Sequence, residues 1–280
     1  MIFKSVKQLK DVVKNKENKL GLPANTILNY YMMERLLCRI EQSEYADNFV
    51  IKGGFLISSL IGIDMRSTMD VDATLKGIAL HSDTIKTIIE TITNIDLQDH
   101  ITWKIEKISA IHEQGSYEDF RITLIAHFFN MRVPVKLDLT TGDVIVPREI
   151  DYSYPLLFSD EKLQIKAYPI FTILAEKIES ILVRNVSNTR ARDFYDVYIL
   201  SKQNPDLDRA QLKEALYRKA EERRSLIYLK EKDKYLNDIE KSKELQEIWQ
   251  NYRRKNSYAK NLTWEKVIEN LKKLICSFTF

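Results

Sequence analysis

The sequence contains few residues of the kinds that form disulfides and soft metal sites. Its two cysteines, Cys38 and Cys276, lie far apart and among apolar neighbours. We therefore expect two free, buried thiols in a reducing compartment. No Cys-x-x-Cys pair is present, which argues against metal binding by cysteine. The four histidines have no spacing typical of metal ligands, and we assign them no role.

Several other features are also missing. No apolar run reaches the length of a membrane span, and the start of the chain lacks the sustained apolar core of a secretory signal. We therefore expect a cytoplasmic protein with no membrane partner. Neither a Gly-x-Ser-x-Gly elbow nor a P-loop occurs, which argues against a hydrolase triad and a Walker-type ATPase. With 280 residues, 44% of them hydrophobic, the chain is long enough for a full core and two lobes.

The most informative pattern begins at Phe49. A short apolar strand is followed by Gly53-Gly54, an apolar run of helix length and then Asp70-Val71-Asp72. On a strand, Asp70 and Asp72 point to the same face, and a bound Mg²⁺ relieves the repulsion between two such carboxylates. A glycine turn before a helix brings backbone N–H groups to a phosphate. The pattern indicates a nucleotidyltransferase site, although a surface Asp-x-Asp in a hairpin fits it equally well.

A second segment supports the first. Residues 131–140 alternate strictly between apolar and polar side chains, which predicts a half-buried strand. Lys136 and Asp138 share its polar face, so Asp138 is a candidate third carboxylate for the metal. Alternatively, both side chains decorate the solvent side of an edge strand, because Pro134 favours an edge or a strand start.

A third segment is predicted to form an amphipathic helix after Pro169. Lys177 interrupts its apolar stripe, and a lysine there either extends to solvent or needs an anionic partner such as a triphosphate. The next helix carries Arg192 and Asp196 at the spacing of a surface ion pair. This arrangement leaves Asp193 available for another role.

Taken in order, these segments resemble the AbiEii/AbiGii toxins, which are nucleotidyltransferase-like toxins of bacterial abortive-infection (type IV toxin–antitoxin) systems. The resemblance covers about residues 25 to 200. The glycine pair with Asp70-Val71-Asp72 is similar to the first family motif, although the family often has Gly-Ser where this chain has Gly54. Residues 136–139 are similar to the second motif, and residues 174–177 with 192–196 to the third. The fourth motif, a lone acidic residue, stays open between four positions: Asp206, Asp208, Asp233 and Asp238.

The resemblance implies an enzyme that transfers a nucleotidyl group from an NTP, with GTP as one candidate, in a reaction that depends on Mg²⁺ or Mn²⁺. The implied acceptor is RNA such as the tRNA 3′ end, and a cognate antitoxin encoded alongside would act without direct contact. The implied catalytic residues are Asp70, Asp72, Lys177 and Asp193. The metal ligands are Asp70, Asp72 and Asp138, and the nucleotide-binding residues are Gly53, Gly54, Lys136 and Asp138. Two alternatives remain: a GTP-binding toxin without RNA transfer, and a transferase that modifies a protein or a small molecule.

The expected fold is α/β (α+β), with a nucleotidyltransferase-like mixed-sheet lobe and a mostly helical C-terminal lobe. We predict N-terminal helices in residues 1–45, the catalytic lobe in 46–155 and the helical lobe in 156–280, with a helical pattern from about residue 160 onward. Residues 101–109 and 120–129 are predicted strands, joined by a turn at Gly115-Ser116.

Charge is unevenly distributed along the chain. The whole chain carries +3, but from Leu212 onward 17 Lys and Arg residues face 11 Asp and Glu residues. Two basic clusters, Arg223-Arg224 and residues 253–255, are candidates for RNA binding, and the second lies near Trp249, Tyr252 and Tyr258. The same segment also fits the solvated face of a helix bundle. A surface around Arg66 and Lys76 is the alternative position for RNA.

Overall fold

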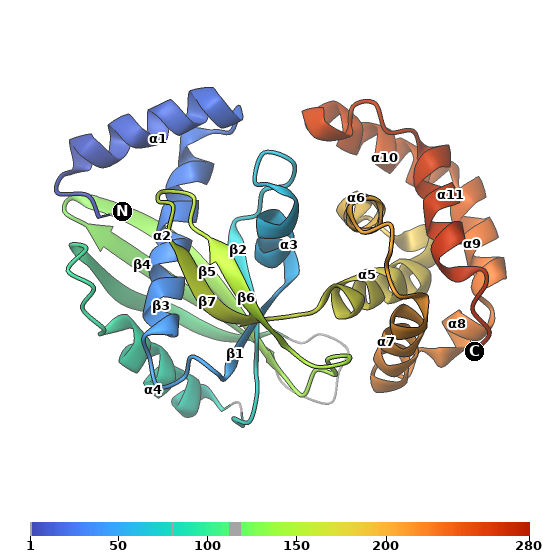
Figure 1. Cartoon of the computed structure of the whole chain (residues 1–280), viewed down its shortest axis with the longest axis horizontal. Helices are drawn as coiled ribbons and strands as arrows, with labels where there is room; N and C mark the ends of the chain where they lie inside the picture. Colours follow the sequence, from blue (N-terminus) through green and yellow to red (C-terminus); the bar gives the residue numbers. More distant parts are fainter. Residues whose placement is uncertain (1, 80, 112–118) are drawn as a thin grey trace. The chain divides into compact units, whose positions relative to one another are not determined.

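The computed structural model describes residues 2–79, 81–111 and 119–280. The chain divides into two compact units (Figure 1). Unit 1 comprises Met1–Asp143 and Glu149–Ala167, and unit 2 comprises Val144–Arg148 and Tyr168–Phe280. The turn predicted at Gly115-Ser116 lies outside the described residues.

Unit 1 is built on a mixed β-sheet, which has seven strands in the described part of the chain, in the order β3-β4-β5-β2-β1-β7-β6. The strands are β1 (Phe49–Lys52), β2 (Asp70–Leu75), β3 (Ile101–Ile111), β4 (Asp119–Phe128), β5 (Met131–Thr141), β6 (Ile150–Pro155) and β7 (Lys162–Ala167). β2 is parallel to β5 and β1 is parallel to β7, and the other neighbouring strands are antiparallel. The mixed sheet confirms the predicted fold class.

Four helices accompany this sheet among the residues described: α1 (Val6–Leu20), α2 (Ala24–Glu41), α3 (Gly53–Ile61) and α4 (Ser82–Thr93). The apolar side chains Val71 of β2 and Leu137 of β5 are fully buried. α2 and α4 pack on the sheet, α1 packs on α2, and α3 packs on β1 and β2. Because α2 is covered by strands on one side and by α1 on another, it is buried over most of its length.

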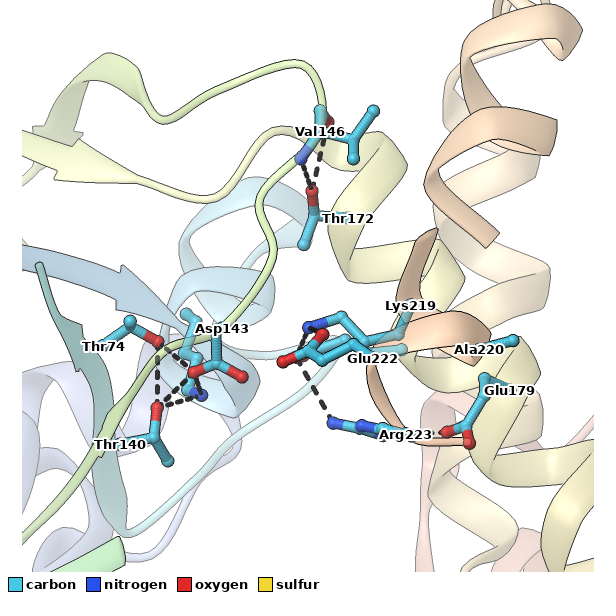
Figure 2. A network of polar contacts seen from close by, with 12 residues as sticks. Thr74, Thr140, Asp143, Val146, Thr172, Glu179, Lys219, Ala220, Glu222 and Arg223 are labelled. Carbon is cyan, nitrogen blue, oxygen red and sulfur yellow. Dashed lines mark hydrogen bonds and ion pairs between the residues drawn. The ribbon is translucent and has the colours of Figure 1, made fainter. Parts of the chain in front are cut away.

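Unit 2 is helical in its described residues (Figure 1). Its helices are α5 (Ile170–Arg184), α6 (Ala191–Gln203), α7 (Arg209–Glu222), α8 (Leu226–Lys230), α9 (Lys232–Lys241), α10 (Lys243–Lys255) and α11 (Trp264–Ile275). α5 contacts α6, α7, α8 and α9, so it forms the centre of the unit. The segment Val144–Arg148, which lies between β5 and β6 in the sequence, is held to α5 by Thr172. The Thr172 hydroxyl accepts from the Val146 N–H at 2.9 Å and donates to the Val146 carbonyl at 3.1 Å (Figure 2).

Two predictions about local structure are wrong. Residues 162–167, expected to belong to the helical region, form strand β7, whose alternate residues Leu163, Ile165 and Ala167 are buried. Cys276 is exposed rather than buried, because it lies just after the end of α11, whereas Cys38 is buried as expected. None of the described helices combines the length and the apolar character needed to cross a membrane.

Candidate active site

Strand register brings four of the predicted site residues to one face of the sheet in unit 1. Asp70 and Asp72 alternate with buried Val71 on β2. On the parallel strand β5, Lys136 lies opposite Asp70, and Asp138 lies opposite Asp72. Directly opposed residues project from the same face of a sheet. Three carboxylates and one ammonium group therefore share a small surface.

Two further charged residues extend this surface, and no sequence pattern pointed to either of them. Lys52 on β1 lies opposite Asp72, and Arg121 on β4 lies opposite Asp138. Lys52, Asp72, Asp138 and Arg121 thus form a row across four adjacent strands. We call this set of four side chains the charged row. Its two carboxylates lie in the middle and its two cations at the ends.

Arg121 binds Asp138 in a bidentate arrangement, through one edge of its guanidinium group. Arg121 Nε donates to Asp138 Oδ1 at 2.8 Å, and Nη2 donates to Oδ2 at 2.6 Å. The pKa of Arg121 is raised, chiefly by the hydrogen bonds to Asp138 and additionally by the negative charges of Asp138, Asp70 and Asp72. Arg121 therefore lies within the electrostatic field of all three predicted metal ligands.

Lys52 is held at the other end of the charged row. Its ammonium group donates to Thr140 Oγ1 at 2.6 Å and to Asp143 Oδ2 at 2.7 Å. Asp143 also accepts from the hydroxyl of Thr74 at 2.5 Å, and Figure 2 shows Thr74 and Thr140 turned toward Asp143. Lys52 is buried. This cation is therefore fixed in the sheet beside Asp72.

The sheet face that carries Asp70, Asp72 and Asp138 is called the carboxylate face. Gly53 and Gly54 fit closely against it. Gly53 has a φ of +63°, and a Cβ atom at this position would overlap the Asp72 carboxylate. The Gly54 N–H donates to Asp72 Oδ2 at 3.2 Å. The pair was predicted to bring N–H groups to a phosphate. In this structure the Gly54 N–H orients Asp72 instead, and the phosphate role stays a prediction.

Arg66 holds the start of α3 through the carbonyl group of Gly54. Its Nη1 donates to the Gly54 carbonyl at 2.9 Å, and a Cβ atom on Gly54 would lie 2.5 Å from Arg66 Nη1. Only 2% of Arg66 is exposed. A buried arginine cannot contact RNA at the surface, so the part of the alternative RNA position that rests on Arg66 is wrong. Lys76 is exposed, and its part stays a prediction.

The donor set partly fits a divalent cation. Across residues 2–79, 81–111 and 119–280, no group of three or more His, Cys, Asp or Glu side chains is arranged to hold a metal ion. Asp138, the predicted third ligand, is bound to Arg121. Asp70 and Asp72 remain as a pair of oxygen ligands, and Mg²⁺ commonly uses one or two protein carboxylates together with substrate phosphates. These two residues are thus suited to such an ion.

In unit 2, Lys177 on α5 lies between two carboxylates of α6. Its Nζ atom is 2.5 Å from Asp193 Oδ1 and 3.3 Å from Asp196 Oδ2. Asp196 is fully buried and Asp193 is 4% exposed. The interpretation of Asp196 as a surface residue is therefore wrong, and Asp193 is already engaged with the lysine. The anionic partners that Lys177 requires are present within the protein.

The residue before Lys177 belongs to a second ion network, between α5 and α7. Glu176 lies 3.4 Å from Lys219 and 3.5 Å from Arg223, and Glu179 lies 2.8 Å from Arg223. Figure 2 shows Lys219 together with Glu222, and these two groups are 2.7 Å apart. Arg223, predicted as part of a basic RNA-binding cluster, is instead committed to glutamates of unit 2.

The second basic cluster is only partly available for RNA. Trp249 is 1% exposed, and its indole N–H donates to the Leu262 carbonyl. Arg253 donates to the Lys260 carbonyl through two nitrogens. Base stacking on Trp249 is therefore excluded. Arg254 and Lys255 are exposed and remain candidates for phosphate contacts.

Comparison with known proteins places these residues in context. A family model described as "Nucleotidyl transferase AbiEii toxin, Type IV TA system" matches residues 35–270, a range that includes every predicted site residue. No curated protein sequence matches the chain.

Two solved structures that match this chain have little sequence identity to it. A Helicobacter pylori structure assigned as a nucleotidyltransferase is 15% identical, covers 92% of this chain and 100% of its own, and has a TM-score of 0.51. The protein JHP933 from Helicobacter pylori is 14% identical over 89% of this chain and 90% of its own, with a TM-score of 0.47. At this identity, the first match shows a shared fold.

Proposed function

The chain belongs to the AbiEii family of nucleotidyl transferase toxins from type IV toxin–antitoxin systems, and we propose that it transfers a nucleotidyl group from an NTP to RNA. On this proposal the reaction takes place in the cytoplasm, depends on Mg²⁺ or Mn²⁺, and arrests growth by modifying RNA such as the tRNA 3′ end. GTP is the first nucleotide to test. A cognate antitoxin, encoded alongside, counteracts the toxin without direct contact.

The observation that carries this proposal is the register between β2 and β5, which gathers Asp70, Asp72, Lys136 and Asp138 on one face. Asp70 and Asp72 would hold the divalent ion. When bound, such an ion stabilises negative charge on the attacking and leaving oxygens of a phosphoryl group. Lys136 lies opposite Asp70 on β5, and it would neutralise the triphosphate.

The remaining residues act by orientation and charge. The Gly54 N–H holds Asp72 in place, and the N-terminus of α3 after Gly53 is the proposed contact for a phosphate. In unit 2, Asp193 and Asp196 hold the Lys177 ammonium group. We assign Lys177 to a nucleotide phosphate and Asp193 to the proton of the acceptor hydroxyl.

A transfer assay tests the proposal directly. The protein is incubated with total tRNA and each NTP labelled at the α-phosphate, with Mg²⁺ or with EDTA. Label is expected in RNA, with Mg²⁺ only. Asp70→Asn should reduce the rate by roughly two orders of magnitude or more, because the metal ion supplies several kcal/mol of charge stabilisation. Asp11→Asn on the exposed side of α1 is the matched control and should leave the rate unchanged.

The other outcomes identify the alternatives. NTP binding in calorimetry without label in any acceptor would indicate a nucleotide-binding toxin. Label in protein or in a small molecule would change the acceptor but keep the chemistry. Full transfer by Asp70→Asn would show that the carboxylates on β2 are not the catalytic site.

A further inference from the structure

Arg121 is one of two residues on the carboxylate face, together with Lys52, that no family motif or sequence pattern accounts for. It comes from β4, on the far side of β5 from Asp70 and Asp72. Its guanidinium binds both oxygens of Asp138, and it also lies within the field of Asp70 and Asp72. Arg121 thus adds a positive charge, beside those of Lys136 and Lys52, to the three carboxylates that were predicted to bind a dication.

Resting on the proposed function, we propose that Arg121 is a built-in counter-cation that a divalent ion must displace from Asp138. In the metal-free protein, Arg121 compensates the clustered negative charge and occupies both Asp138 oxygens. Binding of the ion with its nucleotide breaks the Arg121–Asp138 pair and frees Asp138 as a further oxygen ligand. Arg121 therefore sets the metal concentration at which the site is filled.

Electrostatics supports competition rather than cooperation. A guanidinium and a divalent cation that share one carboxylate repel each other, and the strength of this repulsion depends on how far water screens it. The bidentate contact of Arg121 uses Asp138 Oδ1 and Oδ2, which are the oxygens that a metal ion would need. The side chain of Arg121 is 42% exposed, compared with 19% for Asp138. Arg121 can therefore move into solvent, whereas Asp138 stays in the sheet.

The test measures metal affinity rather than activity. Mn²⁺ is titrated calorimetrically into the wild type, Arg121→Gln and Arg121→Lys, each with a non-transferable NTP analogue present. We expect Arg121→Gln to bind Mn²⁺ roughly tenfold more tightly, because a like charge has been removed and Asp138 has been released. Arg121→Lys keeps the charge but loses the bidentate contact, so its Mn²⁺ affinity should fall between those of the wild type and Arg121→Gln.

Arg132→Gln is the matched control. Arg132 lies on the same polar face of β5, but it is six residues from Asp138, or about 20 Å along the strand. Its removal should leave Mn²⁺ affinity unchanged. In the double variant Arg121→Gln with Asp138→Asn, the gain in affinity should disappear, which would show that the gain passes through Asp138.

Thermal unfolding gives a second measurement that also reports folding. Arg121→Gln removes the cation bound to Asp138 and leaves the repulsion among the three carboxylates less compensated, so it should unfold at a lower temperature than the wild type in EDTA. Its Tm should rise further than that of the wild type when Mn²⁺ is added, since tighter binding stabilises the folded state more.

Three results would overturn the inference in distinguishable ways. If Mn²⁺ binding requires Asp70 but is not tightened in Arg121→Gln, the metal site stands and the competition by Arg121 does not exist. If Arg121→Gln binds Mn²⁺ more weakly, Arg121 supports Asp138 as a ligand instead of blocking it. If none of the proteins binds Mn²⁺ and transfer persists in EDTA, the inference and the metal-dependent function both fail.

Discussion

At the scale of single residues, Gly53 and Asp72 depend on each other. The positive φ of Gly53 turns the chain so that α3 begins directly against β2, and the space a side chain would need is filled by the Asp72 carboxylate. The next residue, Gly54, donates its N–H to the same carboxylate. The aspartate is thus positioned by backbone atoms, which leave less freedom than side chains do.

Two effects would destabilise an alanine at Gly53: the steric overlap of its Cβ atom with Asp72, and the strain of a positive φ. A second glycine allows the two effects to be separated. Gly21 has a similar φ of +67° but nothing within 4 Å of its Cβ position. Gly21→Ala should therefore destabilise the protein by about 1–2 kcal/mol, from backbone strain alone. Gly53→Ala should cost clearly more, because Asp72 must move as well. Urea unfolding of both variants measures the difference, and equal losses would show that the contact with Asp72 is easily relieved.

At the scale of the elements, α5 and α6 are joined through Lys177. Lys177→Met keeps the length of the side chain but leaves buried Asp193 and Asp196 without this cation. Removing one partner of a buried ion pair typically costs about 3–5 kcal/mol, and we expect the lower end, since 20% of the Lys177 side chain is exposed.

Denaturant unfolding measures this loss, with Lys266→Met on the exposed face of α11 as a control that should change stability by less than about 0.5 kcal/mol. Adding Asp193→Asn to Lys177→Met should restore part of the loss, because one unpaired carboxylate is removed. A fully stable Lys177→Met variant would mean that Lys177 has no structural role.

A second junction joins α2 to the turn between β6 and β7. Glu34 accepts from the Leu157 N–H at 2.7 Å, and burial raises the pKa of its carboxyl group to about 8. Between the ordinary pKa of 4.5 and about pH 8, Glu34 is therefore protonated in the folded protein and ionised in the unfolded chain. The stability that this proton contributes is present at low pH and is lost as the pH rises through about 8.

Glu34→Gln should flatten this dependence, because glutamine keeps an acceptor oxygen for Leu157 without taking a charge. The unfolding free energy of the wild type should fall between pH 5 and pH 8, and that of Glu34→Gln should fall less. Glu44→Gln, at an exposed position just after α2, is the control and should follow the wild type. Parallel curves for all three proteins would contradict the assignment to Glu34.

At the scale of the whole molecule, charge separates by sequence: the basic excess lies beyond Leu212. Much of it serves the fold, since Lys219 and Arg223 bind glutamates and Arg253 binds the Lys260 carbonyl. Arg254 and Lys255 remain exposed. If the second basic cluster binds RNA, Arg254 and Lys255 can contact phosphates without breaking the hydrogen bonds that Arg253 makes to the Lys260 carbonyl.

The double variant Arg254→Gln with Lys255→Gln should weaken tRNA binding and lower the slope of affinity against salt concentration by roughly 1.4–1.8, or about 0.7–0.9 for each phosphate contact. Filter binding at several salt concentrations measures both quantities. Lys10→Gln with Lys14→Gln on α1 removes the same charge elsewhere and should have no effect. An unchanged slope in the first variant would place RNA on another surface.

Elements with a local sequence pattern could be predicted from the sequence. Contacts that depend on which strands pair with each other could not. β5 was predicted from its strict alternation, and α5 from its helical spacing. β7 was missed because six alternating residues are too short a signal beside long helical segments. Arg121 and Lys52 carry no local mark of their role, since each becomes significant only opposite Asp138 or Asp72. Arg66 looked like a surface residue because its buried acceptor, the Gly54 carbonyl, is invisible in sequence.

The sheet order also determines when this site can form during synthesis. β1 pairs with β7 through Val50 and Lys166, and β2 pairs with β5 through Asp72 and Asp138. Both contacts close long loops, and contacts of this kind form slowly because the chain must first lose the entropy of closure. A ribosome must therefore translate past Ala167 before the sheet of unit 1 is complete. The carboxylate face itself needs β5, so a growing chain carries Asp70 and Asp72 until Thr141 has been translated before they can be arranged for chemistry.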